Sequence, residues 1–108
     1  MLPAELPEDK ALLKTVLAPL LEDFLYWFER SLEALEKHEL PFMAEAQQQN
    51  LIKRIQTAQA EVGAAKSLFE ATDGSVAIDM KAVLPWHQLV QECWGVAQKR
   101  RQYEASQE

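Results

Sequence analysis

The stretch from Leu51 to Phe69, LIKRIQTAQAEVGAAKSLF, decides the fold class of this chain. Its apolar residues alternate by four and three positions, which places them on one face of an α-helix as a heptad-like seam. The seam consists of Leu51, Ile55, Ala58, Val62, Ala65 and Phe69. Because such a face must be buried against another element, we predict a helix from about Ala44 to Ala71 that packs against other helices.

The same stretch carries a group of residues with almost no side-chain bulk. Small residues allow the backbone of a neighbouring helix to come close, so we expect a close helix approach beside this group. The group is Ala58, Ala60, Gly63, Ala64 and Ala65.

The segment on the N-terminal side predicts a second helix, from about Glu8 to Lys37. Its apolar residues are spaced by threes and fours, with Ser31 filling one gap in the stripe. Pro19 lies inside this pattern and removes one backbone hydrogen bond, so we expect a kink there. Leu40 precedes a proline, which disfavours helical geometry and ends the segment. The stripe includes Leu13, Val16, Leu17, Leu20, Phe24, Trp27, Phe28 and Leu35.

The C-terminal side predicts a third helix after a turn. Gly74 suits the left-handed position that ends a helix, and Asp79 is a good N-cap for a short extra turn near 79–84. Pro85 fits the first position of a helix that extends to about Tyr103. The buried face of this helix is expected to hold Trp86, Leu89, Val90, Cys93 and Ala97.

Three helices with short connections predict an all-α, antiparallel three-helix bundle formed by residues 1–108 as a single domain. A chain of 108 residues is large enough to bury one core without disulfides or metals. The composition agrees, since 48% of the residues are hydrophobic and only three are glycine, too few for many tight β-turns.

Charge and cysteine content exclude several classes of protein. The formal net charge is −6, and residues 1–40 alone carry nine acids and four bases, which repels nucleic-acid phosphates. The longest apolar run, Val16 to Leu21, is far too short to span a bilayer, so we expect no integral membrane protein; peripheral association stays open. The lone Cys93 cannot form an internal disulfide, which favours a reducing cytoplasm.

No residue pattern completes a catalytic or metal-binding site. His87 and Cys93 are six residues apart, about 240° around a helix, so they face different ways. Neither histidine has a glutamate three residues before it, and no paired-cysteine motif exists, so we predict no metal and no cofactor. Asp79 near His87 leaves an acid–base pair as the enzymatic alternative, although a helix cap is the simpler interpretation of Asp79.

The aromatic residues form the most distinctive set. Trp27 and Trp94 belong to different predicted helices and are able to stack on each other or on a ligand. These rings have three open interpretations: all are core, some form a partner-protein surface, or some hold a flat apolar ligand such as a pigment. We predict a partner-binding surface that comprises Tyr26, Asp79, Trp86, His87, Glu92 and Trp94.

Two blocks of the chain also resemble a known family. LLKTVLAPLLEDFLYWFERS near the start, and FEATDG with IDM and PWHQLVQECW later, are similar to a small cyanobacterial family of unknown function. The resemblance covers about Leu12 to Trp94. It implies a non-secreted protein of a photosynthetic bacterium and an association with the photosynthetic or carbon-fixing apparatus. It implies no activity, cofactor or catalytic residue.

Our hypothesis from the sequence is a non-enzymatic interaction or assembly-helper protein that binds a protein partner. The alternatives are a binder of a small apolar ligand such as a pigment or lipid, and an uncharacterised enzyme that uses Asp79 and His87. A homodimer through the seam that runs from Leu51 to Phe69 is a further possibility.

Overall fold

The computed structural model describes the backbone of residues 2–38, 40–72 and 80–107, and the side chains of residues 15–38, 40–72 and 81–107. Within these ranges the regular structure consists of three α-helices without any strand. They are α1 (Leu2–Lys37), α2 (Glu45–Ala71) and α3 (Met80–Gln107). The prediction of an all-α protein with three helices is therefore confirmed.

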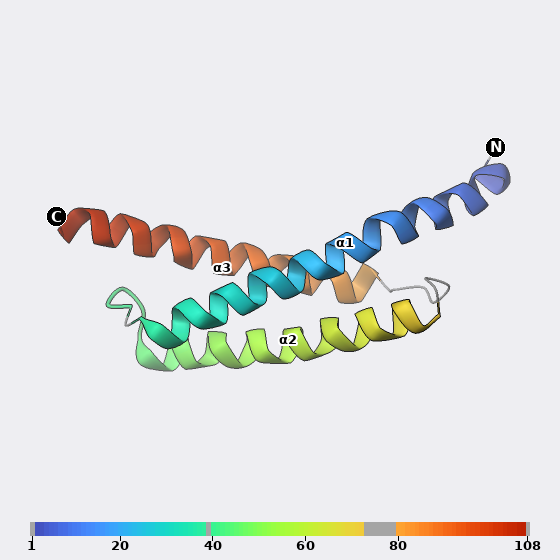
Figure 1. The fold of residues 1–108 in the computed structure, drawn as a ribbon. Coiled ribbons are helices and arrows are strands. Elements are labelled where there is room, and N and C mark those ends of the chain that lie inside the picture. Colours follow the sequence, from blue (N-terminus) through green and yellow to red (C-terminus); the bar gives the residue numbers. More distant parts are fainter. Residues whose placement is uncertain (1, 39, 73–79, 108) are drawn as a thin grey trace.

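The three helices form an elongated molecule of 58 × 25 × 18 Å in which α1 is the shared element. Figure 1 shows α2 running back alongside α1 after the turn at residues 38–44, while α3 crosses α1 and then diverges from it. Both other helices pack on α1. This divergence leaves a wedge between the C-terminal parts of α1 and α3 (Figure 1).

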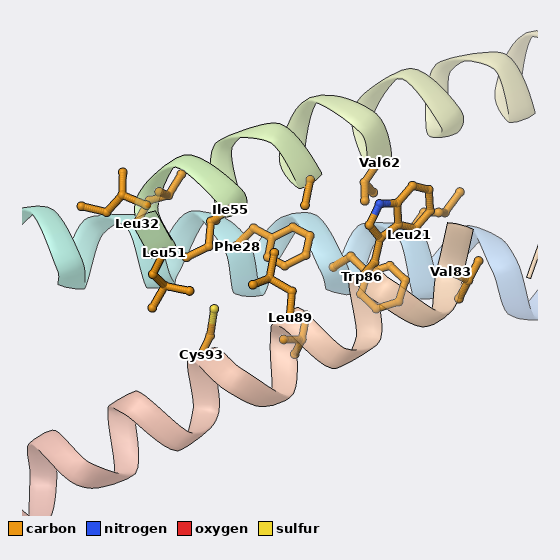
Figure 2. Close-up of a cluster of buried hydrophobic side chains, with 14 of the residues drawn as sticks. Leu21, Phe28, Leu32, Leu51, Ile55, Val62, Val83, Trp86, Leu89 and Cys93 are labelled. Carbon is orange, nitrogen blue, oxygen red and sulfur yellow. The ribbon is translucent and has the colours of Figure 1, made fainter. Parts of the chain in front are cut away.

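One continuous apolar core joins the three helices (Figure 2). Phe24 of α1 lies 6.3 Å from Phe28 and meets Trp86 of α3 edge-on at 6.0 Å, measured between ring centroids. Such pairs add about 0.5–1.5 kcal/mol to the free energy gained by burying the rings. The buried residues are Leu17, Leu21, Phe24, Phe28, Leu32, Leu35, Leu40, Leu51, Ile52, Ile55, Ala58, Val62, Phe69, Val83, Trp86, Leu89, Val90 and Cys93.

The turn between α1 and α2 is held by a glutamine. The side-chain amide of Gln48 donates hydrogen bonds to the carbonyl oxygens of Leu35, at 2.6 Å, and His38, at 3.1 Å. These carbonyls lie at the C-terminal end of α1, where no helical N–H remains to bind them. At the start of α2 the side-chain oxygen of Gln47 accepts from the Ala44 N–H at 3.0 Å. Two glutamines thus fix where α1 ends and α2 begins.

The predicted seam of α2 is the face that packs on α1 and α3. Five of its six residues are buried, and Ala65 is half-buried against the same core. Because the seam is covered within one molecule, it is not available for the predicted homodimer unless α2 separates from α1. The expected close approach at the small residues is wrong for Gly63, since no atom lies within 4 Å of the place a Cβ would occupy.

The third helix begins earlier than predicted. Instead of a short turn near 79–84 followed by a helix from Pro85, a single helix starts at Met80 and contains Pro85 in its second turn. Pro85 removes one helical hydrogen bond there. Val83 explains the difference, because it is 4% exposed and contributes to the core only if residues before the proline are helical.

The first helix is also longer than predicted, since it begins at Leu2 and continues unbroken through Pro19. The kink expected at Pro19 stays a prediction. Three of the predicted stripe residues with described side chains are not buried, because Val16 is 49% exposed and both Leu20 and Trp27 are only half-buried. Leu21 and Leu32 complete the buried face instead. The predicted caps Gly74 and Asp79 lie outside the described residues.

Candidate functional site

The wedge between α1 and α3 contains a groove of about 220 Å³. Its position follows from the crossing of the two helices, which touch through Phe24 and Trp86 and then separate beyond Cys93 (Figures 1 and 2). We call it the Trp27–Trp94 groove. Its lining residues are Trp27, Arg30, Ser31, Ala34, Leu35, Leu40, Leu51, Cys93, Trp94, Val96, Ala97, Arg100 and Arg101.

Three aromatic rings form a row at the groove, and two of them, Trp27 and Trp94, line it. Trp27 of α1 meets Trp94 of α3 edge-on with 5.5 Å between ring centroids, and it meets Tyr26 edge-on at 5.1 Å. Trp94 is 45% exposed and Tyr26 is 52% exposed. Each exposed ring is thus held in place by a half-buried one. Fixed, partly exposed aromatic rings lose little conformational entropy when a partner covers them.

The rest of the rim is formed by arginines. Arg30 lies over the ring of Tyr26, with its guanidinium carbon 5.5 Å from the ring centroid, and donates a hydrogen bond to the Tyr26 hydroxyl at 3.2 Å. Arg100 and Arg101 line the groove from α3. The lining contains three of the four arginines of the chain and no aspartate or glutamate. The groove is therefore cationic although the whole chain is acidic.

Arg100 has a hydrogen-bond donor that the described residues do not satisfy. Its Nε atom is shielded from solvent without a hydrogen bond, and the Glu104 carboxylate lies 3.7 Å away, too far for one. A shielded donor without an acceptor costs about 1–3 kcal/mol.

The floor of the groove is apolar, and its one thiol has low reactivity. It includes Leu35, Leu51 and the thiol of Cys93, which is buried. Burial raises the pKa of the Cys93 thiol, and a hydrogen bond with Ser31 only partly opposes this. A thiol with a raised pKa forms little thiolate at neutral pH, and thiolate is the reactive form. The floor is thus suited to apolar contact.

A larger hollow of about 850 Å³ lies beside the turn at residues 38–44, but it is open and mostly polar. Its charged lining residues have both signs, for example Glu36, Lys37 and Lys53. Its lining has no Phe, Tyr or Trp ring and no single dominant charge. The smaller Trp27–Trp94 groove, with its apolar floor and uniform positive rim, is the better candidate site.

Comparison with known protein families gives a match that includes every residue of the groove. Residues 7–102 match a family described as a protein of unknown function, DUF2605. The chain belongs to the DUF2605 family. Every residue that lines the groove, from Trp27 to Arg101, falls within the matched part of this DUF2605 chain. No curated protein and no solved structure matches it.

Two of the predicted contact residues of the DUF2605 chain lie at the groove. A third lies on the same face of α3 as Trp94, two helical turns before it. Trp94 lines the groove, and Tyr26 stacks on Trp27 at its edge. His87 is exposed on α3. His87, Trp94 and Arg101 are seven residues apart, so they lie nearly in line along one face of α3.

Three other predicted contact residues are not part of this surface. Trp86 is only 5% exposed, and its indole N–H donates to Glu61 Oε1 at 3.1 Å, so its ring is not accessible to a partner. Glu92 is exposed but paired with Arg54 of α2. Asp79 lies outside the described residues. Trp86 is therefore a core residue and does not belong to the contact surface that we predicted.

Glu92 is held as a carboxylate by its partner. Arg54 Nη1 donates to Glu92 Oε1 at 2.9 Å, and Nη2 donates to Oε2 at 2.6 Å. These hydrogen bonds lower the pKa of Glu92 and raise that of Arg54. A carboxyl group with a lowered pKa is poorly suited to donate a proton near neutral pH.

The prediction that His87 and Cys93 face different ways is confirmed, because His87 is exposed and Cys93 is buried. Within the described part of the chain, no three His, Cys, Asp or Glu side chains gather to hold a metal ion. None of the helices in that part combines the length and apolar character needed to cross a bilayer.

The arginines of the rim were not among the predicted contact residues. In the sequence, the run of Lys99, Arg100 and Arg101 near the end of a helical pattern indicates only a favourable charge at the negative end of the helix dipole. One signal does exist in the sequence. Arg30 follows Tyr26 by four positions, and Arg101 follows Trp94 by seven, so each arginine shares a helix face with an aromatic residue.

Proposed function

We propose that this protein is a non-enzymatic interaction or assembly-helper protein that binds a partner protein at the Trp27–Trp94 groove. The observation that carries the proposal is the row of Tyr26, Trp27 and Trp94, in which two exposed rings are fixed beside an apolar hollow. Large exposed aromatic residues mark contact surfaces, and Trp, Tyr and Arg are the residues that most often dominate binding energy there.

The size of the groove supports a protein partner over a pigment or lipid. Sites for small organic ligands usually have about 300–1,000 Å³ and enclose most of the ligand. The groove has about 220 Å³ and is open to solvent at Trp94, which suits one large side chain of another protein. A pigment-sized ligand would need the helices to separate.

The geometry of the ionisable groups supports a non-enzymatic role. Glu92 is engaged by Arg54, and the Cys93 thiol is buried among apolar residues. The enzymatic alternative needs Asp79 and His87 to converge in one cleft, and no described hollow contains His87 together with another acid–base residue in a closed site.

The cellular context of the proposal comes from the sequence resemblance. From it we infer a role in the cytoplasm of a cyanobacterium, in association with the photosynthetic apparatus or with a component of carbon fixation. Peripheral attachment to a thylakoid membrane through the partner is compatible with this role.

The test is a pull-down of tagged full-length protein from a cyanobacterial lysate, with partners identified by mass spectrometry. Trp94→Ala should abolish recovery of the partner while the thermal midpoint changes little, because half of the ring is already exposed. His87→Ala is expected to weaken recovery through the same face. Leu84→Ala is the matched control, since Leu84 is 55% exposed on the same helix but does not line the groove.

Two results would count against the proposal. If Trp94→Ala unfolds the protein, the ring belongs to the core rather than to a contact surface. If the purified protein absorbs visible light or retains a lipid, the apolar-ligand alternative takes its place.

A further inference from the structure

We propose that the partner docks as an acidic amphipathic segment, with one bulky apolar side chain on the groove floor and carboxylates on Arg30 and Arg101. This inference rests on the proposed function, because it names the chemistry of the partner at the same groove. It is carried by charge complementarity between the groove and its occupant.

The distribution of charge in the chain is the first argument. The chain has 17 acids in 108 residues, so an even spread would place about two among the thirteen residues that line the groove. The lining has none, and it has three arginines. The remaining arginine, Arg54, is engaged by Glu92. The positive charge of the arginines is thus concentrated where the aromatic rings are exposed.

The placement of the arginines is the second argument. Arg30 lies on the α1 wall, and Arg100 and Arg101 lie on the α3 wall, with the apolar floor between them. Within the described part of the chain, no carboxylate forms an ion pair with Arg30 or Arg101. A guanidinium binds a carboxylate through two parallel hydrogen bonds, which a lysine cannot match. A partner segment with an apolar side chain on the groove floor would therefore place its own carboxylates on the arginines of both walls.

Arg30 is already positioned for such a contact. Its guanidinium is held over the Tyr26 ring and hydrogen-bonded to the Tyr26 hydroxyl. A side chain that is fixed before binding loses less conformational entropy when it binds. Arg100 adds a further guanidinium to the same rim, paired with Glu104 of its own helix at 3.7 Å.

The surroundings of the groove give the contact its specificity. Residues 1–40 carry a net charge of −5, and exposed acids such as Glu29 and Glu33 lie on α1 beside the groove residues. An acidic segment is repelled by these acids and attracted by the arginine rim. Like charges outside a site and opposite charges within it fix both the position and the orientation of a partner.

The experiment is a selection of random 12-residue peptides displayed on phage against the immobilised full-length protein. Enriched peptides should share a Leu, Phe, Trp or Met flanked within four residues by Asp or Glu. The strongest peptide is then synthesised with a fluorescent label, and its Kd is measured by anisotropy at low and high salt.

Charge-reversal variants test the role of the rim. Arg30→Glu with Arg101→Glu should weaken peptide binding at least about tenfold, and raising NaCl should weaken binding to the unmodified protein. Lys99→Glu is the matched control, because Lys99 lies on the same helix as Arg101 but does not line the groove, and it should change the Kd less than about twofold. Should the Glu variants lose their fold by circular dichroism, Arg30→Gln with Arg101→Gln replaces them.

The outcomes separate this inference from the proposed function. Binding that is lost in Trp94→Ala but kept in the arginine variants refutes the acidic segment and leaves the interaction surface standing. Binding that survives both sets of variants refutes both proposals. Neutral or basic enriched peptides, peptides that reproduce α1 of this chain, or no enrichment at all would each overturn the acidic partner.

Discussion

Arg54 of α2 and Glu92 of α3 form a two-point ion pair, with hydrogen bonds of 2.9 and 2.6 Å between the guanidinium and the two carboxylate oxygens. The Nε of Arg54 also donates to Asn50 Oδ1 at 2.8 Å, which fixes the orientation of the guanidinium. Both α2 and α3 pack mainly on α1. The direct contacts between α2 and α3 include hydrogen bonds made by long side chains. This pair and the Trp86–Glu61 hydrogen bond are two such contacts.

The first prediction concerns the pH dependence of this pair. Because the pKa of Glu92 is lowered in the folded state, the pair stabilises the fold above the unfolded carboxyl pKa of about 4.3. The contribution is lost as the pH falls through the lower, folded pKa. In a double-mutant cycle of Arg54→Ala and Glu92→Ala at pH 7 we expect a coupling of about 0.5–1 kcal/mol, since the side chains are 45% and 43% exposed.

The control for that cycle is the Lys66–Glu70 pair of α2, whose N–O distance is 3.5 Å. It joins positions within one helix, so its coupling should be about 0.3–0.5 kcal/mol and should not report on contact between α2 and α3. Urea unfolding at pH 7 and pH 3 measures both pairs. A coupling between Arg54 and Glu92 that is unchanged at pH 3 would contradict the role of the carboxylate.

The Arg54–Glu92 pair also shows what sequence patterns do not reveal. The two residues are 38 positions apart, and each is an ordinary charged residue on an exposed helix face. Their meeting depends on how far α3 rotates about its axis and where it crosses the hairpin of α1 and α2. Glu92 was therefore predicted to contact a partner, although an internal arginine binds it.

The second prediction separates core from surface among the tryptophans. Trp86→Phe keeps the ring contact with Phe24 but removes the hydrogen bond to Glu61, so we expect a loss of about 1 kcal/mol in the free energy of unfolding. Trp86→Ala should cost about 3–5 kcal/mol because it empties a core site. Trp94→Ala should cost clearly less than Trp86→Ala, because Trp94 is 45% exposed and its removal takes away the ring pair with Trp27 without emptying a core site.

Chemical denaturation of these variants is the measurement, with Glu61→Gln as a control that keeps an oxygen acceptor for the Trp86 N–H. Equal losses for Trp86→Ala and Trp94→Ala would show that both rings belong to the core. That result would also remove the observation that carries the proposed interaction surface.

The third prediction is that Gly63→Ala stabilises the protein. Gly63 lies inside α2, and no atom lies within 4 Å of the position of an added Cβ, so the methyl group meets no clash. Alanine is favoured over glycine in a helix interior by about 1 kcal/mol. For a domain of this size that corresponds to a rise of roughly 4–8 °C in Tm, measurable by circular dichroism.

Gly95→Ala in α3 is the companion variant, because its Cβ would also meet no atom within 4 Å. It should stabilise by a similar amount. A loss of stability in Gly63→Ala would mean that another helix lies closer to α2 than the structure places it, as the small-residue pattern had suggested.

Helical periodicity predicted most of the fold because it depends only on local geometry. The seam of α2 was correct in position and ends, since a heptad-like pattern leaves one way to bury its face. The helix start was misplaced at Pro85 because the preference of proline for a first helical turn is weaker than the gain from burying Val83, two residues earlier. Tertiary packing thus changed a boundary without changing the helix count.

The candidate site was only half predictable. The sequence placed Trp27 and Trp94 on different helices and left open whether they meet each other or a ligand; in the structure their rings meet edge-on. Which side chains line the hollow beside them depends on the divergence of α1 and α3, which no local pattern encodes. Arg100 and Arg101 looked like helix-end charges for that reason.

The final prediction uses Cys93 as a reporter of the groove. Its thiol is buried on the groove floor, and burial raises its pKa, so at pH 8 the folded protein should hold less thiolate than the unfolded chain. The labelling rate with a disulfide reagent such as dithionitrobenzoate should therefore be a small fraction of the rate in denaturant. It should fall further when an acidic peptide occupies the groove, because the peptide covers the remaining access. Ser31→Ala removes the hydrogen bond that lowers the pKa of the thiol, so the thiol of this variant should be labelled more slowly still. If the native protein is labelled as fast as the denatured chain, α1 and α3 separate readily beside Trp94.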